Sequence, residues 1–133
     1  MLEICRRITL GSLCLLVLTV GGCGGSTDTA PTVQPFPTAL RGSFITTLSG
    51  SGERVTLTIT EGNYQIDRGS NRASGRIAVS GDRIEFSQST ACSGLGAYKW
   101  SVSGTSLLFT SLGADQCPGR SEVLAGYTYT KSG

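Results

Sequence analysis

The sequence predicts an all-β fold, an eight-stranded antiparallel up-and-down β-barrel over residues 40–133. From Leu40 onward, apolar residues alternate with polar ones at a period of two, as in strands that bury one face. Eight such runs follow one another, and no stretch has helical periodicity over a useful length. Glycine, at 19 of 133 residues, falls mostly between the runs. These features together favour short strands joined by turns.

The N-terminal segment has the features of a cleaved leader. Arg6 and Arg7 precede a mostly apolar run, residues 8–20, and small residues follow it. As a helix this run would span about 20 Å, whereas the hydrocarbon core of a bilayer is roughly 30 Å thick. We therefore expect residues 1–22 to be a signal peptide and disfavour a transmembrane anchor. An ordinary secretory signal cut after a small residue is the second alternative.

The end of this leader, Val20-Gly-Gly-Cys23, resembles the lipobox of bacterial lipoproteins. The resemblance implies a lipoprotein signal peptide that is cleaved before Cys23, with a diacylglyceryl group on the Cys23 sulfur. Such acyl chains anchor a protein stably, because each buried CH₂ contributes about 0.8 kcal/mol. Residue 24 is glycine and not aspartate, which favours the outer membrane or cell surface over inner-membrane retention. The expected partner is the membrane, and the expected location is the bacterial cell envelope.

A flexible linker is predicted between the lipid anchor and the barrel. Residues 24–39 contain three of the four prolines, many Gly, Ser and Thr residues, and only one charge. A flexible coil of this length spans about 20–25 Å on average. The chain thus divides into a leader (1–22), a lipidated cysteine with its linker (23–39) and a barrel domain (40–133).

The strands are predicted in order along the domain. The clearest run is 54–60, in which Val55, Leu57 and Ile59 share one face. Five further runs follow at Tyr64/Ile66, Ile77/Val79, Ile84/Phe86, Tyr98/Trp100/Val102 and Leu107/Phe109. Residues 43–48 and 123–130 supply the first and last strands. Closing eight strands into a barrel removes exposed sheet edges, although a two-sheet sandwich is a competing architecture.

The connections alternate in length. Those at 61–63, 80–82 and 103–105 are tight and centred on glycine, while those at 49–53, 69–74, 87–97 and 111–121 are longer. Alternate turns of an antiparallel meander lie at the same end. We therefore expect all the long connections to gather at one rim of the barrel.

Two cysteines remain for the folded domain. Cys5 and Cys14 leave with the leader and Cys23 is lipidated, which leaves Cys92 and Cys117. An exported domain lies in an oxidising compartment, so we expect a disulfide, with two separate buried thiols as the alternative. Both cysteines fall in long connections. The meander therefore brings them to the same rim, as the Cα distance limit of about 7 Å requires.

A second resemblance covers roughly residues 92–124. The segments Cys92-Ser-Gly-Leu-Gly-Ala-Tyr-Lys-Trp100 and Asp115-Gln-Cys-Pro-Gly-Arg120 resemble a pattern in small bacterial lipocalin-like proteins. This resemblance implies a calycin-type barrel, and that group generally binds small hydrophobic molecules.

The strand directions indicate a candidate ligand site at the long-loop end. A barrel of eight strands has room for its own side chains or for one small ligand. Tentative ligand-binding residues are those beside the long loops, the mid-strand tryptophan and a rim arginine: Val55, Ile66, Phe86, Tyr98, Trp100, Phe109 and Arg120. The alternative for the aromatic residues is core packing in a filled barrel. Arg120 either pairs with a ligand carboxylate at the mouth or forms a solvated loop pair with Asp115.

The composition disfavours several function classes. The chain has no histidine, so it lacks the base of Ser-His and Cys-His sites and the commonest metal ligand. It also has no phosphate-cradling Gly loop and no calcium-loop spacing. After the leader is removed, nine basic and eight acidic side chains remain, which gives no electrostatic case for nucleic acid. We expect a protein that is not an enzyme and needs no metal or cofactor.

Two functions of different kinds fit these expectations. The first is a membrane-anchored barrel that binds a small hydrophobic ligand at its long-loop end. The second is an envelope-anchored interaction module, such as an inhibitor of a lytic enzyme or protease, with a filled core and no ligand. A structural surface lipoprotein without any ligand is a third possibility.

Overall fold

The computed structural model describes residues 34–133, which fold into eight antiparallel strands paired in chain order. Strand β8 pairs with β1 and closes the barrel, so the predicted fold class is confirmed. The elements are η1 (Thr38–Leu40), β1 (Gly42–Thr47), β2 (Arg54–Thr60), β3 (Asn63–Arg68), β4 (Asn71–Ser80), β5 (Arg83–Ser87), β6 (Gly96–Ser103), β7 (Ser106–Ser111), α1 (Pro118–Leu124) and β8 (Thr128–Ser132). The predicted leader, Cys23 and the first part of the linker lie outside the described residues.

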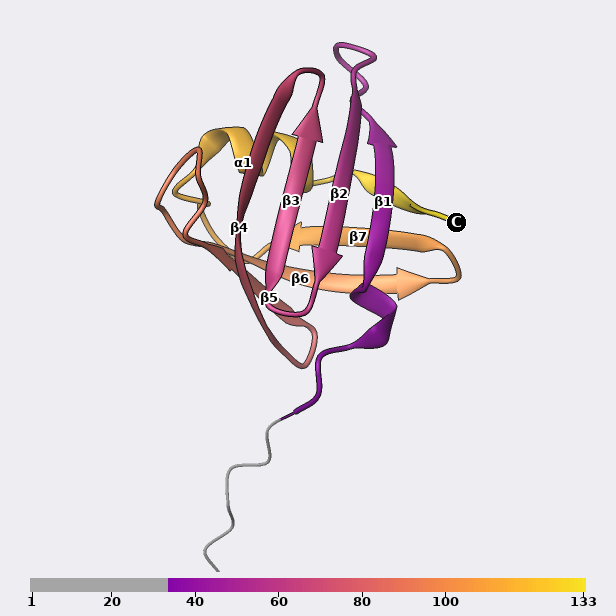
Figure 1. Ribbon diagram of the computed structural model, residues 1–133, viewed down its shortest axis with the longest axis vertical. Coiled ribbons are helices and arrows are strands. Elements are labelled where there is room, and N and C mark those ends of the chain that lie inside the picture. Colours follow the sequence, from indigo (N-terminus) through magenta and orange to yellow (C-terminus); the bar gives the residue numbers. More distant parts are fainter. Residues whose placement is uncertain (1–33) are drawn as a thin grey trace, which may run out of the picture. The chain divides into compact units, whose positions relative to one another are not determined.

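The alternating sequence pattern accounts for the strands. In β2, Val55, Leu57 and Ile59 are at most 1 % exposed, while the threonines between them face outward and are partly exposed. Figure 1 shows β1 to β4 side by side on one wall, with β6 and β7 crossing behind them on the other. The apolar faces of the two walls meet in the interior.

Aromatic rings fill the middle of the barrel. The ring of Phe86 is in edge-to-face contact with those of Tyr64, Tyr98 and Phe109, at centroid distances of 4.9, 5.6 and 5.9 Å. Phe109 in turn contacts Tyr129, at 6.2 Å. Edge-to-face pairs of this kind each contribute about 0.5–1.5 kcal/mol beyond their buried area. The centre of the barrel is therefore a packed core.

Short helices cover both ends of the core. Leu40 of η1 is fully buried at the end where β2 and β3 turn, because η1 leads directly into β1 and Gly42 pairs with Ile59. At the opposite end, α1 joins β7 to β8 and buries Val123 and Leu124. Each end of the barrel is thus closed by side chains from a neighbouring segment.

The folded part begins before the predicted boundary at residue 40. Phe36, which the sequence placed in the linker, packs against the hydrophobic core. The guanidinium of Arg41 lies over the Phe36 ring, 5.8 Å from its centroid, and pairs with Glu61. The buried apolar residues all lie between Leu40 and Tyr129. The described residues therefore contain a complete core of their own.

One predicted connection is shorter than expected. The sequence analysis placed a long loop at 69–74, but β4 begins at Asn71 and only two residues separate it from β3. Asn71 pairs with Arg68, and Arg72 with Asp67. The stretch Asn-Arg-Ala-Ser lacks apolar alternation, yet its backbone completes the ladder, since ladder hydrogen bonds require no apolar side chain. At the end of the barrel where β3 turns into β4, three connections are therefore long, and not the predicted four.

The predicted last strand is also displaced. Residues 118–124 form helix α1, and β8 starts at Thr128 and not at residue 123. Pro118 occupies the first turn of the helix, where its missing N–H costs no hydrogen bond. Arg120, Val123 and Leu124, spaced i, i+3 and i+4, share the buried face. This helical spacing was the sequence signal that the strand prediction overlooked.

Candidate functional site

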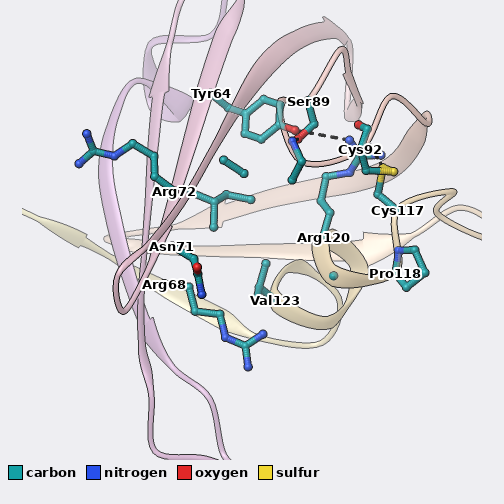
Figure 2. A pocket seen from close by; sticks show the side chains of 14 residues that line it. Tyr64, Arg68, Asn71, Arg72, Ser89, Cys92, Cys117, Pro118, Arg120 and Val123 are labelled. Atoms are coloured by element: carbon teal, nitrogen blue, oxygen red, sulfur yellow. Dashed lines mark hydrogen bonds between the residues drawn. A yellow bond between two sulfur atoms is a disulfide. The ribbon is translucent and has the colours of Figure 1, made fainter.

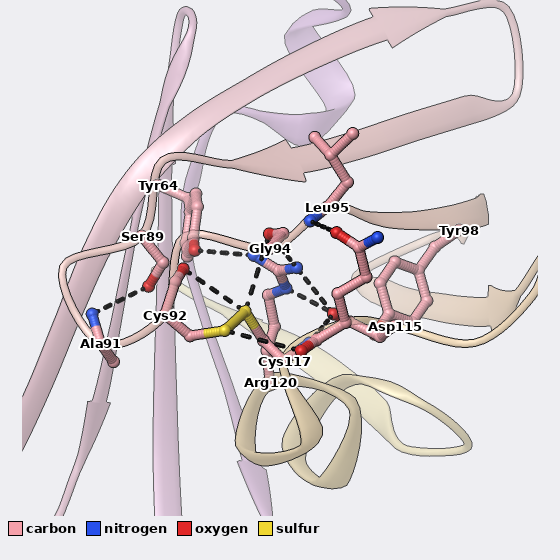
Figure 3. Close-up of a disulfide and its surroundings, with 11 residues drawn as sticks. Tyr64, Ser89, Ala91, Cys92, Gly94, Leu95, Tyr98, Asp115, Cys117 and Arg120 are labelled. Carbon is pink, nitrogen blue, oxygen red and sulfur yellow. Dashed lines mark hydrogen bonds and ion pairs between the residues drawn. A yellow bond between two sulfur atoms is a disulfide. The ribbon is translucent and has the colours of Figure 1, made fainter.

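A disulfide between Cys92 and Cys117 fastens the long-loop end of the barrel (Figure 3). Cys92 lies between β5 and β6, and Cys117 immediately precedes α1. Their Cα atoms are 5.8 Å apart, which is ordinary for a disulfide. The predicted bridge, and its position at the rim with the long connections, are confirmed.

A buried ion pair lies beside the bridge. Arg120 Nη2 is 2.6 Å from Asp115 Oδ1, and Nε is 2.8 Å from Oδ2, so the two planar groups bond in parallel. The side chains are 5 % and 1 % exposed. The interpretation of this pair as a solvated loop contact is wrong, because α1 turns Arg120 toward the barrel interior.

Further hydrogen bonds join this pair to three other segments. The Tyr98 hydroxyl on β6 donates to Asp115 Oδ2 at 2.5 Å, and the backbone N–H of Cys117 donates to Oδ1 at 2.7 Å. Arg120 Nη2 also donates to the Gly94 carbonyl at 2.9 Å, and Nη1 donates to the Tyr64 hydroxyl at 3.4 Å. The dashed lines of Figure 3 show this network around the disulfide. It ties α1, β6 and the long connections together.

The network fixes the ionisation states of Asp115, Arg120 and Tyr98. Burial opposes the charge on Asp115, but hydrogen bonds from Arg120, Tyr98 and the Cys117 N–H outweigh burial and lower the pKa of Asp115. Burial also opposes the charge on Arg120, and the bonds to Asp115 and Tyr64 outweigh it and raise the pKa of Arg120. Burial and the Asp115 bond both raise the pKa of Tyr98. At neutral pH the pair is ionised and the Tyr98 hydroxyl keeps its proton.

Two glycines of the sequence pattern from Cys92 to Trp100 make room for this network. A Cβ on Gly96 would lie 2.3 Å from Asp115 Oδ2, and one on Gly94 would lie 2.4 Å from the Cβ of Gln116. The carboxylate and the segment before α1 therefore pack directly against glycine backbone. Most of the pattern thus has a structural explanation, since it encodes a disulfide, an ion pair and the space they need.

An open pocket of about 550 Å³ lies at the same rim, between the β3–β4 hairpin, the connection after β5 and the start of α1 (Figure 2). We call it the rim pocket. It is lined by Tyr64, Ile66, Arg68, Asn71, Arg72, Ala73, Ser89, Ala91, Cys92, Cys117, Pro118, Gly119, Arg120 and Val123.

The lining of the rim pocket combines apolar groups with cationic ones. Ile66, Ala73, Val123 and the disulfide supply apolar surface, and three arginines but no acidic residue take part. In Figure 2 the guanidinium groups of Arg68 and Arg72 point away from the pocket centre, so their aliphatic stems form its edge. The pocket suits a small ligand with an apolar body, because a concave apolar surface with a few polar groups is typical of ligand sites.

The structure divides the predicted ligand-binding residues into two groups. Ile66 and Arg120 line the rim pocket. The others are core residues: Val55, Phe86, Tyr98 and Phe109 are at most 1 % exposed, and Trp100 is half-buried against the core. Strand direction correctly placed their side chains inward, but it could not show that the interior is filled.

Several pocket residues were not predicted from the sequence. Asn71, Arg72 and Ala73 lie on the part of β4 that was expected to be a loop. Pro118 and Val123 belong to α1, which the periodicity analysis missed. The helical spacing from Arg120 to Leu124 was the available signal for the second group.

Metal-binding and membrane-spanning features were also considered within residues 34–133. This part of the chain contains no group of three or more His, Cys, Asp or Glu residues that could hold a metal ion. In the same range, no helix combines the length and apolar character needed to cross a bilayer. Compared with protein-family models, curated proteins and solved structures, the chain matches none of them.

Proposed function

We propose that this protein is a lipid-anchored binding protein of the bacterial envelope that takes a small apolar ligand in the rim pocket. The observation that carries the proposal is a partly apolar hollow of about 550 Å³ on a disulfide-braced rim. A preformed hollow favours binding, since little conformational entropy is lost when the ligand enters.

The ligand site of this proposal lies at the rim and not inside the barrel. Phe86, Tyr98 and Phe109 are in mutual ring contact in the interior, where a ligand would have to displace them. Displacing buried aromatic side chains is expensive, since removing one typically costs about 3–5 kcal/mol. The rim pocket is reached without moving these rings.

Membrane attachment through Cys23 is the second part of the proposal. Val20-Gly-Gly-Cys23 supplies the lipobox-like sequence, and residues 24–35 supply a connection rich in Gly, Ser, Thr and Pro. Substitution Cys23→Ser should move the protein from the membrane fraction to an unprocessed or soluble form. Cell fractionation of both proteins, together with mass spectrometry of the N-terminus of the unsubstituted protein, tests this point. An unlipidated native N-terminus would contradict it.

A non-enzymatic role completes the proposal. The rim pocket contains no histidine and no acidic residue that could serve as a general base. Cys92 and Cys117 are joined in the disulfide, so neither sulfur is a free nucleophile. The remaining polar groups are donors suited to binding.

The binding proposal is tested with anilinonaphthalene, a neutral apolar probe whose fluorescence rises in an apolar site. The protein is residues 24–133, exported through an oxidising compartment so that the bridge forms. We expect saturable binding of one probe per chain. Ala91→Trp places a large side chain in the rim pocket and should weaken binding at least tenfold.

The matched control is Ala78→Trp, at an exposed position of β4 outside the pocket. Its affinity for the probe should stay within about twofold of the unsubstituted protein. Equal affinity of the two variants would refute the rim pocket as the binding site.

A second candidate function is supported by a different surface. Leu95 and Leu112 are 57 % and 49 % exposed and border a small hollow beside the rim. The Leu95 backbone is held on both sides by Gln116, through bonds of 2.8 and 3.0 Å. A fixed, exposed leucine pair favours contact with another protein. Leu95→Ser should abolish capture of a defined envelope protein partner, whereas Leu108→Ser should not.

A further inference from the structure

We propose that the ligand of the rim pocket carries an anionic group, received by Arg120 Nη1 and the Tyr64 hydroxyl. This inference depends on the proposed ligand-binding function and specifies the chemical class of the ligand. The predicted class is a small molecule with an apolar body and one acidic group.

The first argument is a count of the donors of Arg120. A guanidinium has five N–H donors. Nε and Nη2 are occupied by Asp115 and the Gly94 carbonyl, at 2.6–2.9 Å. Among residues 34–133, the one acceptor for Nη1 is the Tyr64 hydroxyl, at 3.4 Å, which is long for a hydrogen bond. Arg120 is 7 % exposed and lines the pocket, and Nη1 keeps one N–H without an acceptor among the described residues.

The second argument concerns Tyr64. Its hydroxyl accepts from Arg120, but no hydrogen bond among the described residues takes its own proton. Tyr64 is 2 % exposed and also lines the rim pocket. Figure 2 shows the Tyr64 hydroxyl and the Arg120 side chain directed toward one another at the pocket wall.

Packing holds this hydroxyl in place. Tyr64 pairs with Gly75 on β4, and a Cβ at Gly75 would lie 2.7 Å from Tyr64 Cε1 and 3.0 Å from its oxygen. The ring therefore crosses directly over glycine backbone. A donor fixed in this way is preorganised to meet an acceptor in the pocket.

The charge of the lining decides which acceptor is favoured. Arg68, Arg72 and Arg120 line the pocket, while their carboxylate partners Glu53, Glu122, Asp67 and Asp115 are absent from the lining. The guanidinium groups of Arg68 and Arg72 point away from the pocket centre, so Arg120 is the cationic group that an anion would meet, and no acidic side chain lines the pocket. The hydrogen bonds of an anion with Arg120 would also be charge-assisted, which makes them about twice as strong as neutral ones.

The test uses two probes that differ only in a sulfonate, anilinonaphthalene and anilinonaphthalene sulfonate. The protein is again residues 24–133 with the bridge formed. The sulfonate probe should bind at least tenfold more tightly than the neutral probe. In Tyr64→Phe, which removes one donor and keeps the ring, this preference should fall below about threefold.

The matched control is Tyr127→Phe, which removes the hydroxyl of a half-buried tyrosine that does not line the rim pocket. It should keep the full preference for the sulfonate. Competition by decanoate and decanol extends the test in the unsubstituted protein, so the result does not depend on a variant that folds poorly. Decanoate should displace the probe at a concentration at least tenfold lower than decanol.

The outcomes separate this inference from the proposed function. Equal affinity for both probes, and equal competition by decanoate and decanol, would overturn the anionic ligand and leave apolar binding intact. Full preference for the sulfonate in Tyr64→Phe would overturn the assigned donors. Failure of both probes to bind would overturn the proposed function itself.

Discussion

The Cα of Gly96 lies directly against the Asp115 carboxylate, and Gly94 lies against Gln116 in the same way. Both glycines were visible in the sequence as part of a spaced pattern with Tyr98 and the two cysteines. The reason for the spacing was not visible, because it depends on contacts with residues about twenty positions later. At this scale the sequence indicated which residues belong together, and the structure shows that they pack around a buried charge pair.

Gly96→Ala tests the close approach at this position. The added Cβ would lie 2.3 Å from Asp115 Oδ2, so the carboxylate must move and its hydrogen bonds must distort. We expect a loss of about 1–3 kcal/mol in the free energy of unfolding, as for other overpacked sites. The measurement is urea unfolding followed by tryptophan fluorescence. Gly50→Ala, where no atom lies within 4 Å of the added Cβ, is the control and should change little.

Asp115→Asn tests the charge pair and its pH dependence. Because the pKa of Asp115 is lowered in the folded state, its carboxylate stabilises the fold at pH values above its unfolded pKa of about 3.9. This contribution is lost as the pH falls from there through the lower folded value. The variant should lose about 3–5 kcal/mol at pH 7, because Arg120 is left buried without a counter-charge. Its stability should also fall less steeply below pH 4.

Urea unfolding at pH 7 and at pH 3 measures both effects. Asp82→Asn removes the carboxylate of an exposed pair with Lys99 and should alter stability by less than about 1 kcal/mol. If Asp115→Asn behaved like this control, the pair would have no structural role.

Among the elements, strand number and pairing order followed from the sequence. The apolar alternation of β2 and β7 required only local information. The first half of β4 was missed because its residues from Asn71 are mostly polar, and it pairs with β3 through the backbone ladder and the Arg72–Asp67 ion pair. Helix α1 was missed because a helix of only seven residues resembles one more alternating run. Both missed elements line the rim pocket, so lining residues such as Ala73 and Val123 could not be assigned to it from the sequence.

Leu124→Ala tests the contribution of α1 to the core. Leu124 is fully buried at the C-terminal end of this helix, so truncation leaves a cavity. We expect a loss of about 2–5 kcal/mol in the free energy of unfolding. Leu108→Ala, on the outward face of β7 and 38 % exposed, is the control, since its side chain already contacts water. Similar losses for the two variants, measured by urea unfolding, would argue against α1 as part of the core.

For the whole molecule, the sequence correctly predicted a closed barrel and the disulfide at its long-loop rim. Both follow from the meander, in which alternate connections share an end. The candidate ligand residues were only partly correct, because the same inward direction serves a packed core and a ligand cavity. Side-chain volume decides between these, and Phe86, Tyr98 and Phe109 together occupy the space.

Removal of the disulfide tests the stability of the entire domain. The bridge spans a sequence separation of 25 residues, and its loss should lower the free energy of unfolding by about 3.5 kcal/mol through the entropy of the unfolded chain. The variant carries both Cys92→Ala and Cys117→Ala. Urea unfolding should show the loss, while the fluorescence of the folded state stays unchanged. No loss of stability would mean that the ion pair alone fixes the rim.

Neighbouring strands of the barrel are not joined by equal numbers of paired residues. Six residue pairs join β1 to β2 and six join β2 to β3, but only three join β8 to each of its neighbours. We therefore expect local opening to begin at β8, where the ladder is shortest, and amide hydrogens there to exchange with solvent before those of β2. The Tyr129 hydroxyl on β8 donates a hydrogen bond to the Val123 carbonyl of α1. Opening of β8 would therefore also loosen α1, which forms one wall of the rim pocket. For the proposed ligand, transient opening at β8 would offer a route of exchange that leaves the aromatic centre undisturbed.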